Sequence, residues 1–228
     1  ATQYAIDVDI DTACRELLHG AGMAVLSEET GVPAPDGSAS SADAHRALVV
    51  VDPLDGSTNA SLGLPWCATA LCLVLDGEPT VSMVSNLRTR TRYVAIRGQG
   101  ATCAGAAISV NAPCTLAESI VAVNARPPES FRPGQFRAMG ATALDIGAVA
   151  RGGFDGSVDF DADRIGVWDY VASLLVLHEA GGVSSDAHGR DLVVLDPTQR
   201  RQPVTASSPE LLAELLAATQ TAGAEAAS

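Results

Sequence analysis

Hydrophobic and polar positions change their period along the chain, and each change marks a predicted element. Apolar residues recur at helical spacing from Asp7 to Leu18, which predicts a helix. Between residues 47 and 111, apolar runs broken by Gly, Pro and Asp predict the strands Ala47–Val51, Ala68–Leu75, Val81–Asn86, Arg92–Ile96 and a short piece around Ile108. Turn residues at 76–79 and 97–100 favour an antiparallel meander of these strands.

From residue 113 onward, strand-like and helix-like patterns alternate. We predict strands at Ile120–Val123, Val158–Phe160 and Val183–Ser185, and helices at Ala141–Arg151, Trp168–Ala180 and Leu211–Ala218. The Pro- and Gly-rich segments predict surface loops at Gly31–Arg46 and Arg126–Pro133, and the Ala-rich end predicts a frayed tail at Thr219–Ser228. The pattern therefore predicts an α+β half with an antiparallel sheet, residues 1–112, followed by an α/β half, residues 113–228.

Composition and charge exclude several classes of protein. A hydrophobic fraction of 47% in 228 residues allows one large domain or two closely packed halves and excludes global disorder. The formal net charge of −13 argues against partners such as nucleic acid or an anionic membrane, which need clustered Lys and Arg. An acidic protein that handles an anionic substrate needs a cation to mediate the contact.

The cysteine pattern and the absence of long apolar runs indicate the compartment. The chain has 5 cysteines with no C-x-x-C pair, which predicts neither a disulfide framework nor a zinc site and favours a reducing cytoplasm. We see no run long enough for a membrane span, and the first residues are too polar for a signal peptide.

The strongest candidate for chemistry follows the apolar run that ends at Val51. Asp52 and Asp55 place two carboxylates where a buried strand reaches the surface, and such oxygens are the ligands that Mg²⁺ prefers. Gly56, Ser57 and Thr58 follow with backbone N–H groups and hydroxyls that can receive a phosphate. The alternative is an ordinary turn, because Asp, Pro, Gly and Ser are common turn residues.

Two further motifs accompany this one in order. Glu28-Glu29 follows an apolar run upstream, and Trp168-Asp169 opens a helical pattern that ends in E-A-G-G. Together with D-P-L-D-G-S-T-N, these motifs resemble those of the inositol monophosphatase family of Mg²⁺-dependent, lithium-sensitive sugar-phosphate phosphatases. The resemblance covers nearly the whole chain and implies the layered αβαβα sandwich of that family. Residues 59–65, N-A-S-L-G-L-P, resemble most its archaeal branch, which acts on inositol phosphates and fructose bisphosphate.

The resemblance implies a set of metal ligands. Two or three Mg²⁺ ions are implied. The first would be bound by Glu28, Asp52 and the backbone carbonyl of Leu54, and the second by Asp52, Asp55 and Asp169. Glu28 would thus act as a catalytic residue as well as a ligand.

The resemblance also implies the residues that handle phosphate and water. Ser57, hydrogen-bonded towards Asp7, would orient the attacking water, so that Asp7 and Ser57 are catalytic. The backbone N–H groups of Gly56, Ser57 and Thr58 would hold the phosphate beside Asp55. Glu29 is interpreted as an orienting residue beside the ligands.

Substrate residues are implied by a later segment. Gly140, Ala141 and Thr142 resemble the small residues that border the family's sugar pocket, and Arg126 is a candidate for binding a second anionic group, as are Arg132 and Arg137. Where the archaeal branch has D-[IV]-R, this chain has Asp161 in place of the Arg. That change disfavours a bisphosphate and favours a hydroxyl-rich or cationic substrate.

Three expectations concern the rest of the chain. Trp168 is interpreted as a core residue, and His178 as a surface or core histidine and not a metal ligand. Family members carry a further long helix before the one that bears Asp7, so the N-terminus is either natively short or truncated. The family is commonly dimeric, which implies a homodimer.

The sequence thus predicts a Mg²⁺-dependent phosphomonoesterase acting on a small polyol or sugar phosphate. Two other enzymes stay open, a histidinol-phosphate phosphatase and a phosphatase of 3′-phosphoadenosine nucleotides. A non-catalytic, metal-dependent binding or regulatory relative is the alternative outside enzymes. Loss of a ligand or of the water-orienting pair would indicate it, and every such residue is present.

Overall fold

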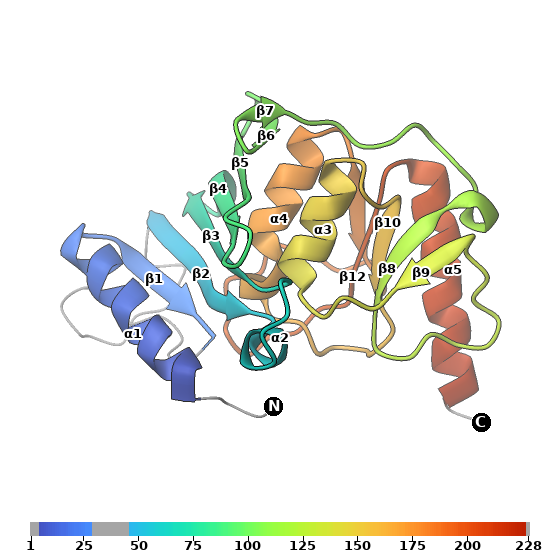
Figure 1. Ribbon diagram of the computed structural model, residues 1–228, viewed down its shortest axis with the longest axis horizontal. Helices are drawn as coiled ribbons and strands as arrows, with labels where there is room; N and C mark the ends of the chain where they lie inside the picture. Colours follow the sequence, from blue (N-terminus) through green and yellow to red (C-terminus); the bar gives the residue numbers. More distant parts are fainter. Residues whose placement is uncertain (1–4, 29–45, 227–228) are drawn as a thin grey trace.

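Two β-sheets and three layers of helices build the molecule, as the computed structural model shows (Figure 1). The structure describes residues 5–28 and 46–226. Helix α1 (Ala5–Gly20) lies outside the first sheet, helices α3 (Thr142–Ala150) and α4 (Val167–Glu179) lie between the sheets, and α5 (Pro209–Ala226) lies outside the second sheet. This arrangement confirms the predicted αβαβα layers.

The first sheet has seven strands in chain order, β1 to β7. They are β1 (Ala24–Ser27), β2 (Ala47–Asp55), β3 (Ala68–Leu75), β4 (Glu78–Asn86), β5 (Arg92–Ile96), β6 (Ala101–Cys103) and β7 (Ala106–Ala107). From β2 onward, each strand is antiparallel to the next, which confirms the predicted meander. Strand β1 was not predicted and pairs parallel to β2, because a strand of only four residues carries no signal for a partner.

The second sheet has the order β11-β12-β10-β8-β9. Its strands are β8 (Ile120–Asn124), β9 (Gln135–Arg137), β10 (Gly156–Asp159), β11 (Val183–Asp186) and β12 (Pro203–Ala206), and a 3₁₀ turn, η2 (Leu116–Glu118), precedes them. Strand β8 is parallel to β9 and β10, whereas β12 is antiparallel to β10 and β11. The alternation of strands and helices predicted for this part of the chain is therefore confirmed.

The central helices are buried almost all round because a sheet covers each side. Every residue of α3 from Ala143 to Ala150 is buried, and α4 buries ten of its residues. Gly147 allows α3 to approach β5, since a Cβ there would lie only 3.4 Å from the Tyr93 ring. These helices are consequently mostly apolar, with Asp145 of α3 and Ser173 of α4 as buried polar exceptions.

Some element predictions were wrong. The piece around Ile108 is not a strand, because β7 ends one residue earlier. The last helix does not stop at Ala218: it continues to Ala226, so the predicted fraying is wrong over Thr219 to Ala226, where Ala favours a continuous helix. Strands β6, β9 and β12 and the short helix α2 (Ser57–Ser61) were missed because each is too short to show a period.

Further expectations concerned the cysteines, a membrane span, one surface loop and the division of the chain into halves. All five cysteines are free thiols, as predicted. Of the helices in the described part of the chain, none has the length and apolar character needed to cross a bilayer. The predicted surface loop at residues 31–46 lies outside the described residues except for Arg46, and the division of the chain at residue 112 stays a prediction.

Candidate metal and phosphate site

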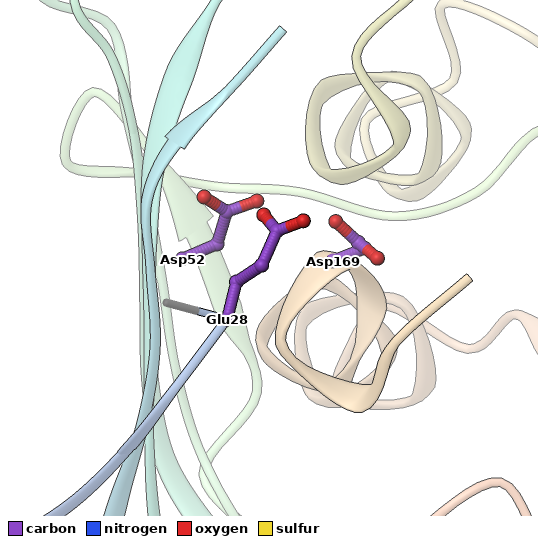
Figure 2. A group of neighbouring side chains, drawn as sticks. All are labelled: Glu28, Asp52 and Asp169. Carbon is purple, nitrogen blue, oxygen red and sulfur yellow. The ribbon is translucent and has the colours of Figure 1, made fainter. Parts of the chain in front are cut away.

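Three carboxylates from distant parts of the sequence point toward one another (Figure 2). Glu28 follows the end of β1, Asp52 lies in β2, and Asp169 lies in the first turn of α4. One ligand oxygen from each lies within 4.8 Å of the others. The parallel pairing of β1 with β2 carries Glu28 to the level of Asp52, because Ser27 pairs with Val51.

A bulge in β2 lets two carboxylates serve one site. In a regular strand, residues three apart face opposite sides of the sheet. Here the register shifts between Asp52, opposite Ala70, and Asp55, opposite Ala68. The bulge re-aims the chain, and both carboxylates are buried and close enough to Asp169 to repel it.

Burial and mutual repulsion make this cluster unfavourable for negative charge. Burial raises the pKa of Asp52 well above its usual range, and the charges of Asp169, Asp55 and Glu28 raise it further. Burial, then the charge of Glu28, raises the pKa of Asp169 to about 7. Because a cation would relieve both effects, the donor set fits a hard divalent metal ion.

The start of α4 fixes Asp169. Its Oδ2 accepts a hydrogen bond of 2.7 Å from the N–H of Gly166. Trp168 packs on the same glycine, where a Cβ would lie 2.3 Å from the indole, and the guanidinium of Arg200 lies 4.9 Å above the ring. Trp168 is 3% exposed, so its interpretation as a core residue is confirmed.

The predicted phosphate-binding residues form a tight turn beside the cluster. Gly56 adopts a left-handed conformation with φ of 82° and caps α2, which begins at Ser57. Ser57 is half-buried and Thr58 is exposed. The N–H of Leu54 donates to Asp52 Oδ1 at 2.9 Å, which shapes the chain between the carboxylates.

Asp55 differs from the three clustered carboxylates in its partners. Its Oδ2 accepts a hydrogen bond of 2.7 Å from the N–H of Ala143 at the start of α3. Burial raises the pKa of Asp55 well above its usual range, and the charge of Asp169 adds to the effect. Asp55 therefore links the strand to the central helix layer, and its predicted role as a metal ligand stays a prediction.

We expect Gly56→Ala to destabilise the protein more than Gly63→Ala. Both glycines have positive φ, 82° and 75°, but a Cβ at Gly56 would lie 2.9 Å from the Trp66 carbonyl oxygen whereas one at Gly63 meets nothing within 4 Å. The left-handed backbone alone costs about 1 kcal/mol, and the clash should raise the loss at Gly56 to about 3 kcal/mol. Urea unfolding of both variants measures this, and equal losses would contradict the close contact.

The predicted substrate segment lies against the phosphate turn. A Cβ at Gly56 would lie 3.1 Å from the Cβ of Ala141 and 3.2 Å from the carbonyl oxygen of Gly140. Thr142 begins α3 and accepts a hydrogen bond of 3.4 Å from Asn124. The structure thus brings Gly140, Ala141 and Thr142 to the turn, and their contact with a substrate stays a prediction.

The predicted charged substrate residues have other surroundings. Asp161 forms an ion pair of 2.9 Å with Arg164, and both side chains are well exposed. Arg126 is exposed, and Arg137 donates to its neighbours Phe136 and Gln135. The carboxylate of Asp161 is therefore not an isolated charge.

Other predicted residues are less informative. Asp7 lies early in α1 but its side chain is outside the described residues, and Glu29 lies wholly outside them. His178 lies 2.8 Å from the hydroxyl of Ser184. Asn59, Trp66 and Asp145 contact the turn or its supports, and no role was predicted for them. The one signal for them in the sequence is the lone carboxylate within the apolar run of residues 141–150.

Comparisons with known proteins agree in family and fold. The sequence model of the inositol monophosphatase family matches residues 3–224. An inositol-1-monophosphatase of Rhizobium meliloti is 34% identical over 160 residues, 64% of this chain and 58% of the relative, so the chain spans less than two thirds of that protein. A fructose-1,6-bisphosphatase/inositol-1-monophosphatase of Thermococcus kodakarensis is 31% identical over 220 residues, 95% of this chain and 82% of the relative.

The solved structures show the same fold. A hypothetical protein of Pyrococcus horikoshii, described as similar to inositol-1 monophosphatase, superposes with a TM-score of 0.84 at 24% identity. The match covers 95% of this chain and 84% of that structure. This likeness supports the layered architecture described above.

Proposed function

The chain belongs to the inositol monophosphatase family, and we propose that it is a Mg²⁺-dependent phosphomonoesterase acting on a small polyol or sugar phosphate. The observation that carries the proposal is the carboxylate cluster of Glu28, Asp52 and Asp169 beside the turn that begins at Gly56. A phosphate monoester needs its negative charge neutralised before water can attack it, and a site lined by carboxylates can do so only through a bound cation.

The chain would hold the metal through its clustered carboxylates. Glu28, Asp52 and Asp169 offer oxygen atoms within 4.8 Å of one another; Asp52 is buried, Asp169 is half-buried and Glu28 is exposed. Carboxylates that repel one another at such short range favour a hard cation such as Mg²⁺. Asp55 and the carbonyl of Leu54 are proposed as further ligands for two or three ions. When bound, the metal would supply a Lewis acid that neutralises the phosphoryl oxygens and stabilises the leaving oxygen.

The turn after Asp55 would bind the phosphate itself. Gly56, Ser57 and Thr58 lie at the start of α2, where backbone N–H groups can donate hydrogen bonds to a phosphate. The hydroxyl of Ser57 would orient the attacking water, with Asp7 as its proposed partner. The carboxylates are committed to the metal, so we propose direct attack by water without a covalent phosphoenzyme.

The substrate class follows from the segment beside the turn. Gly140, Ala141 and Thr142 are small, and they would leave room for a polyol ring next to the phosphate. The names of the relatives indicate inositol monophosphate and fructose bisphosphate as first substrates to test. Pairing of Asp161 with Arg164 weakens the argument that Asp161 repels a second phosphate, so a bisphosphate stays among the candidates.

Alternatives remain as outcomes of the test. A histidinol-phosphate phosphatase would use Asp161 to bind the substrate amine, and Arg126 would suit a phosphoadenosine nucleotide. A metal-dependent binding or regulatory protein would bind metal without turnover. Lithium sensitivity and a homodimer are proposed from the family alone, and a cytoplasmic location is proposed from the cysteine pattern.

The experiment measures phosphate release from a panel of monoesters in Mg²⁺, in EDTA and in added lithium. The panel contains inositol 1-phosphate, fructose 1,6-bisphosphate, histidinol phosphate and 3′-phosphoadenosine 5′-phosphate. We expect release in Mg²⁺ that EDTA abolishes and lithium inhibits. Metal binding without release from any substrate would contradict the proposed function and favour the binding protein.

A further inference from the structure

The amide side chain of Asn59 anchors the proposed phosphate-binding turn, residues 56–58, to neighbouring backbone. Asn59 is buried within the five-residue helix α2, which directly follows the turn. Its Nδ2 donates hydrogen bonds of 2.8 Å to the carbonyl oxygens of Trp66 and Met139, and lies 3.3 Å from that of Gly140. A helix of five residues cannot hold its own conformation in water. The tertiary contacts of Asn59 therefore decide where the turn lies.

The backbone around Trp66 is anchored by hydrogen bonds of its two neighbours in the chain. The preceding carbonyl, that of Pro65, accepts a hydrogen bond of 2.9 Å from the side chain of Asn86 in β4. The following residue, Cys67, accepts one of 2.9 Å from the N–H of Leu87. Trp66 is thus tied to the first sheet on both sides, and its carbonyl oxygen also lies against Gly56.

The indole of Trp66 connects this point to the central helix layer. Its Nε1 donates a hydrogen bond of 2.8 Å to Oδ1 of Asp145 in α3. Asp145 is 0% exposed, and its Oδ2 has no hydrogen-bond partner among the described residues. Burial of a carboxyl group lowers the folding stability unless the group is hydrogen-bonded. In the described structure the hydrogen bond from Trp66 offsets part of this loss.

The first turn of α3 contacts both elements that carry candidate metal ligands, β2 with Asp55 and α4 with Asp169. The N–H of Ala143 donates to Asp55, and the carbonyl oxygen of Ala143 accepts a hydrogen bond of 2.8 Å from Ser173 of α4, the helix that carries Asp169. Asp145 lies two residues farther along α3. The contacts thus run without a break from the phosphate turn to the elements that present the metal ligands.

We propose that Asn59, Trp66 and Asp145 form a positioning network that sets the phosphate-binding turn relative to Asp55 and the substrate segment. The inference rests on the proposed function and adds residues that act through the turn, without touching metal or substrate themselves. Loss of the network should displace the phosphate-binding turn. A displacement of about 1 Å at a reacting centre lowers rates about a hundredfold, so we expect a large loss of phosphate binding and turnover and a smaller loss of folding stability.

Binding of inorganic phosphate to the Mg²⁺-loaded protein tests the proposal by titration calorimetry, alongside turnover of the best substrate. We expect Asn59→Ala to weaken phosphate binding and lower kcat/KM about a hundredfold, with Mg²⁺ affinity changed less than about twofold. The matched control is Asn111→Ala, which removes a 2.8 Å hydrogen bond to Asp155 away from the turn. That control should leave phosphate binding unchanged.

Variants of the Trp66–Asp145 contact separate positioning from simple packing. Trp66→Phe removes the indole N–H and should weaken phosphate binding about tenfold. Asp145→Leu should do the same, whereas Asp145→Asn retains the accepting oxygen and should restore phosphate affinity to within about threefold of the wild type. Trp66→Phe combined with Asp145→Leu should be no worse than either alone, because both break one bond.

The outcomes distinguish this inference from the proposed function. Phosphate binding without turnover in the wild-type protein overturns the function alone, and the variants still test the network. Turnover in the wild-type protein with unchanged phosphate binding in Asn59→Ala, or equal losses in Asp145→Asn and Asp145→Leu, overturns the network alone. Absence of both phosphate binding and turnover in the wild-type protein overturns both.

Discussion

Asp52→Asn is expected to abolish Mg²⁺-dependent phosphate release and, at the same time, to stabilise the metal-free protein. Asp52 is 3% exposed, and its carboxylate is repelled by Asp169, Asp55 and Glu28. The Asn side chain keeps the oxygen that accepts the Leu54 N–H at 2.9 Å, so the bulge should persist. What disappears is the charge that the metal needs.

The two effects have different sizes. Metal-based charge stabilisation contributes several kcal/mol to catalysis, so kcat/KM should fall at least about a thousandfold. Removal of one buried, repelled charge should raise the melting temperature in EDTA at pH 8 by about 4 °C. Phosphate release and thermal unfolding measure the two effects on the same samples.

Asp191→Asn is the control for this experiment. Asp191 is exposed, and its carboxylate lies outside the cluster. The control should change neither activity nor the melting temperature. If Asp52→Asn retained activity, the proposed metal site would be wrong; if it lowered the stability of the metal-free protein, the repulsion argument would be wrong.

The stability of the metal-free protein is expected to fall as the pH rises from about 5 to 8. Burial raises the pKa of Asp169 to about 7 and that of Asp145 to about 8, from 3.8 in each case. Between the unfolded and folded pKa values the folded protein binds more protons than the unfolded chain, so its stability is full at low pH and decreases as the pH rises. Asp52 and Asp55 act in the same direction.

Groups whose pKa is lowered by folding do not cancel this fall of the unfolding free energy with rising pH. The pKa of Glu179 lies below 4.5 and that of Asp186 below 3.8, so the stability they contribute is lost only below the tested range. His178, whose pKa is lowered from 6.5, opposes the trend below that pH as a single group. The unfolding free energy should therefore drop by several kcal/mol between pH 5 and pH 8.

Mg²⁺ should remove most of this loss because it replaces protons in the cluster. Urea unfolding at pH 5, 6.5 and 8, in EDTA and in Mg²⁺, measures the prediction. The stabilisation by Mg²⁺ should be largest at pH 8, and Asp145→Asn in EDTA should have a shallower slope than the wild type. A metal-free stability that rises steadily across this range would contradict the repulsion among these carboxylates.

Elements whose signal is local could be predicted from the amino-acid sequence. The apolar run before Asp52 predicted the first part of β2, although the strand continues beyond the predicted end at Val51 and includes both carboxylates. The pattern from Trp168 to Ala180 predicted α4 within one residue at each end. Three ordered motifs predicted the family and therefore the layered fold. Such features depend on periodicity and on residues adjacent in the chain, so no distant partner is needed to read them.

Tertiary structure alone decided which distant groups meet. Nothing near Ala24 predicts that β1 pairs parallel to β2, yet that pairing brings Glu28 to Asp52. Asp161 indicated a free negative charge until Arg164 was placed beside it, and Trp66 and Asp145, 79 residues apart, gave no sign of their contact. The physical reason is that periodicity specifies which face of an element is buried, whereas the packing of whole layers determines which side chain lies opposite.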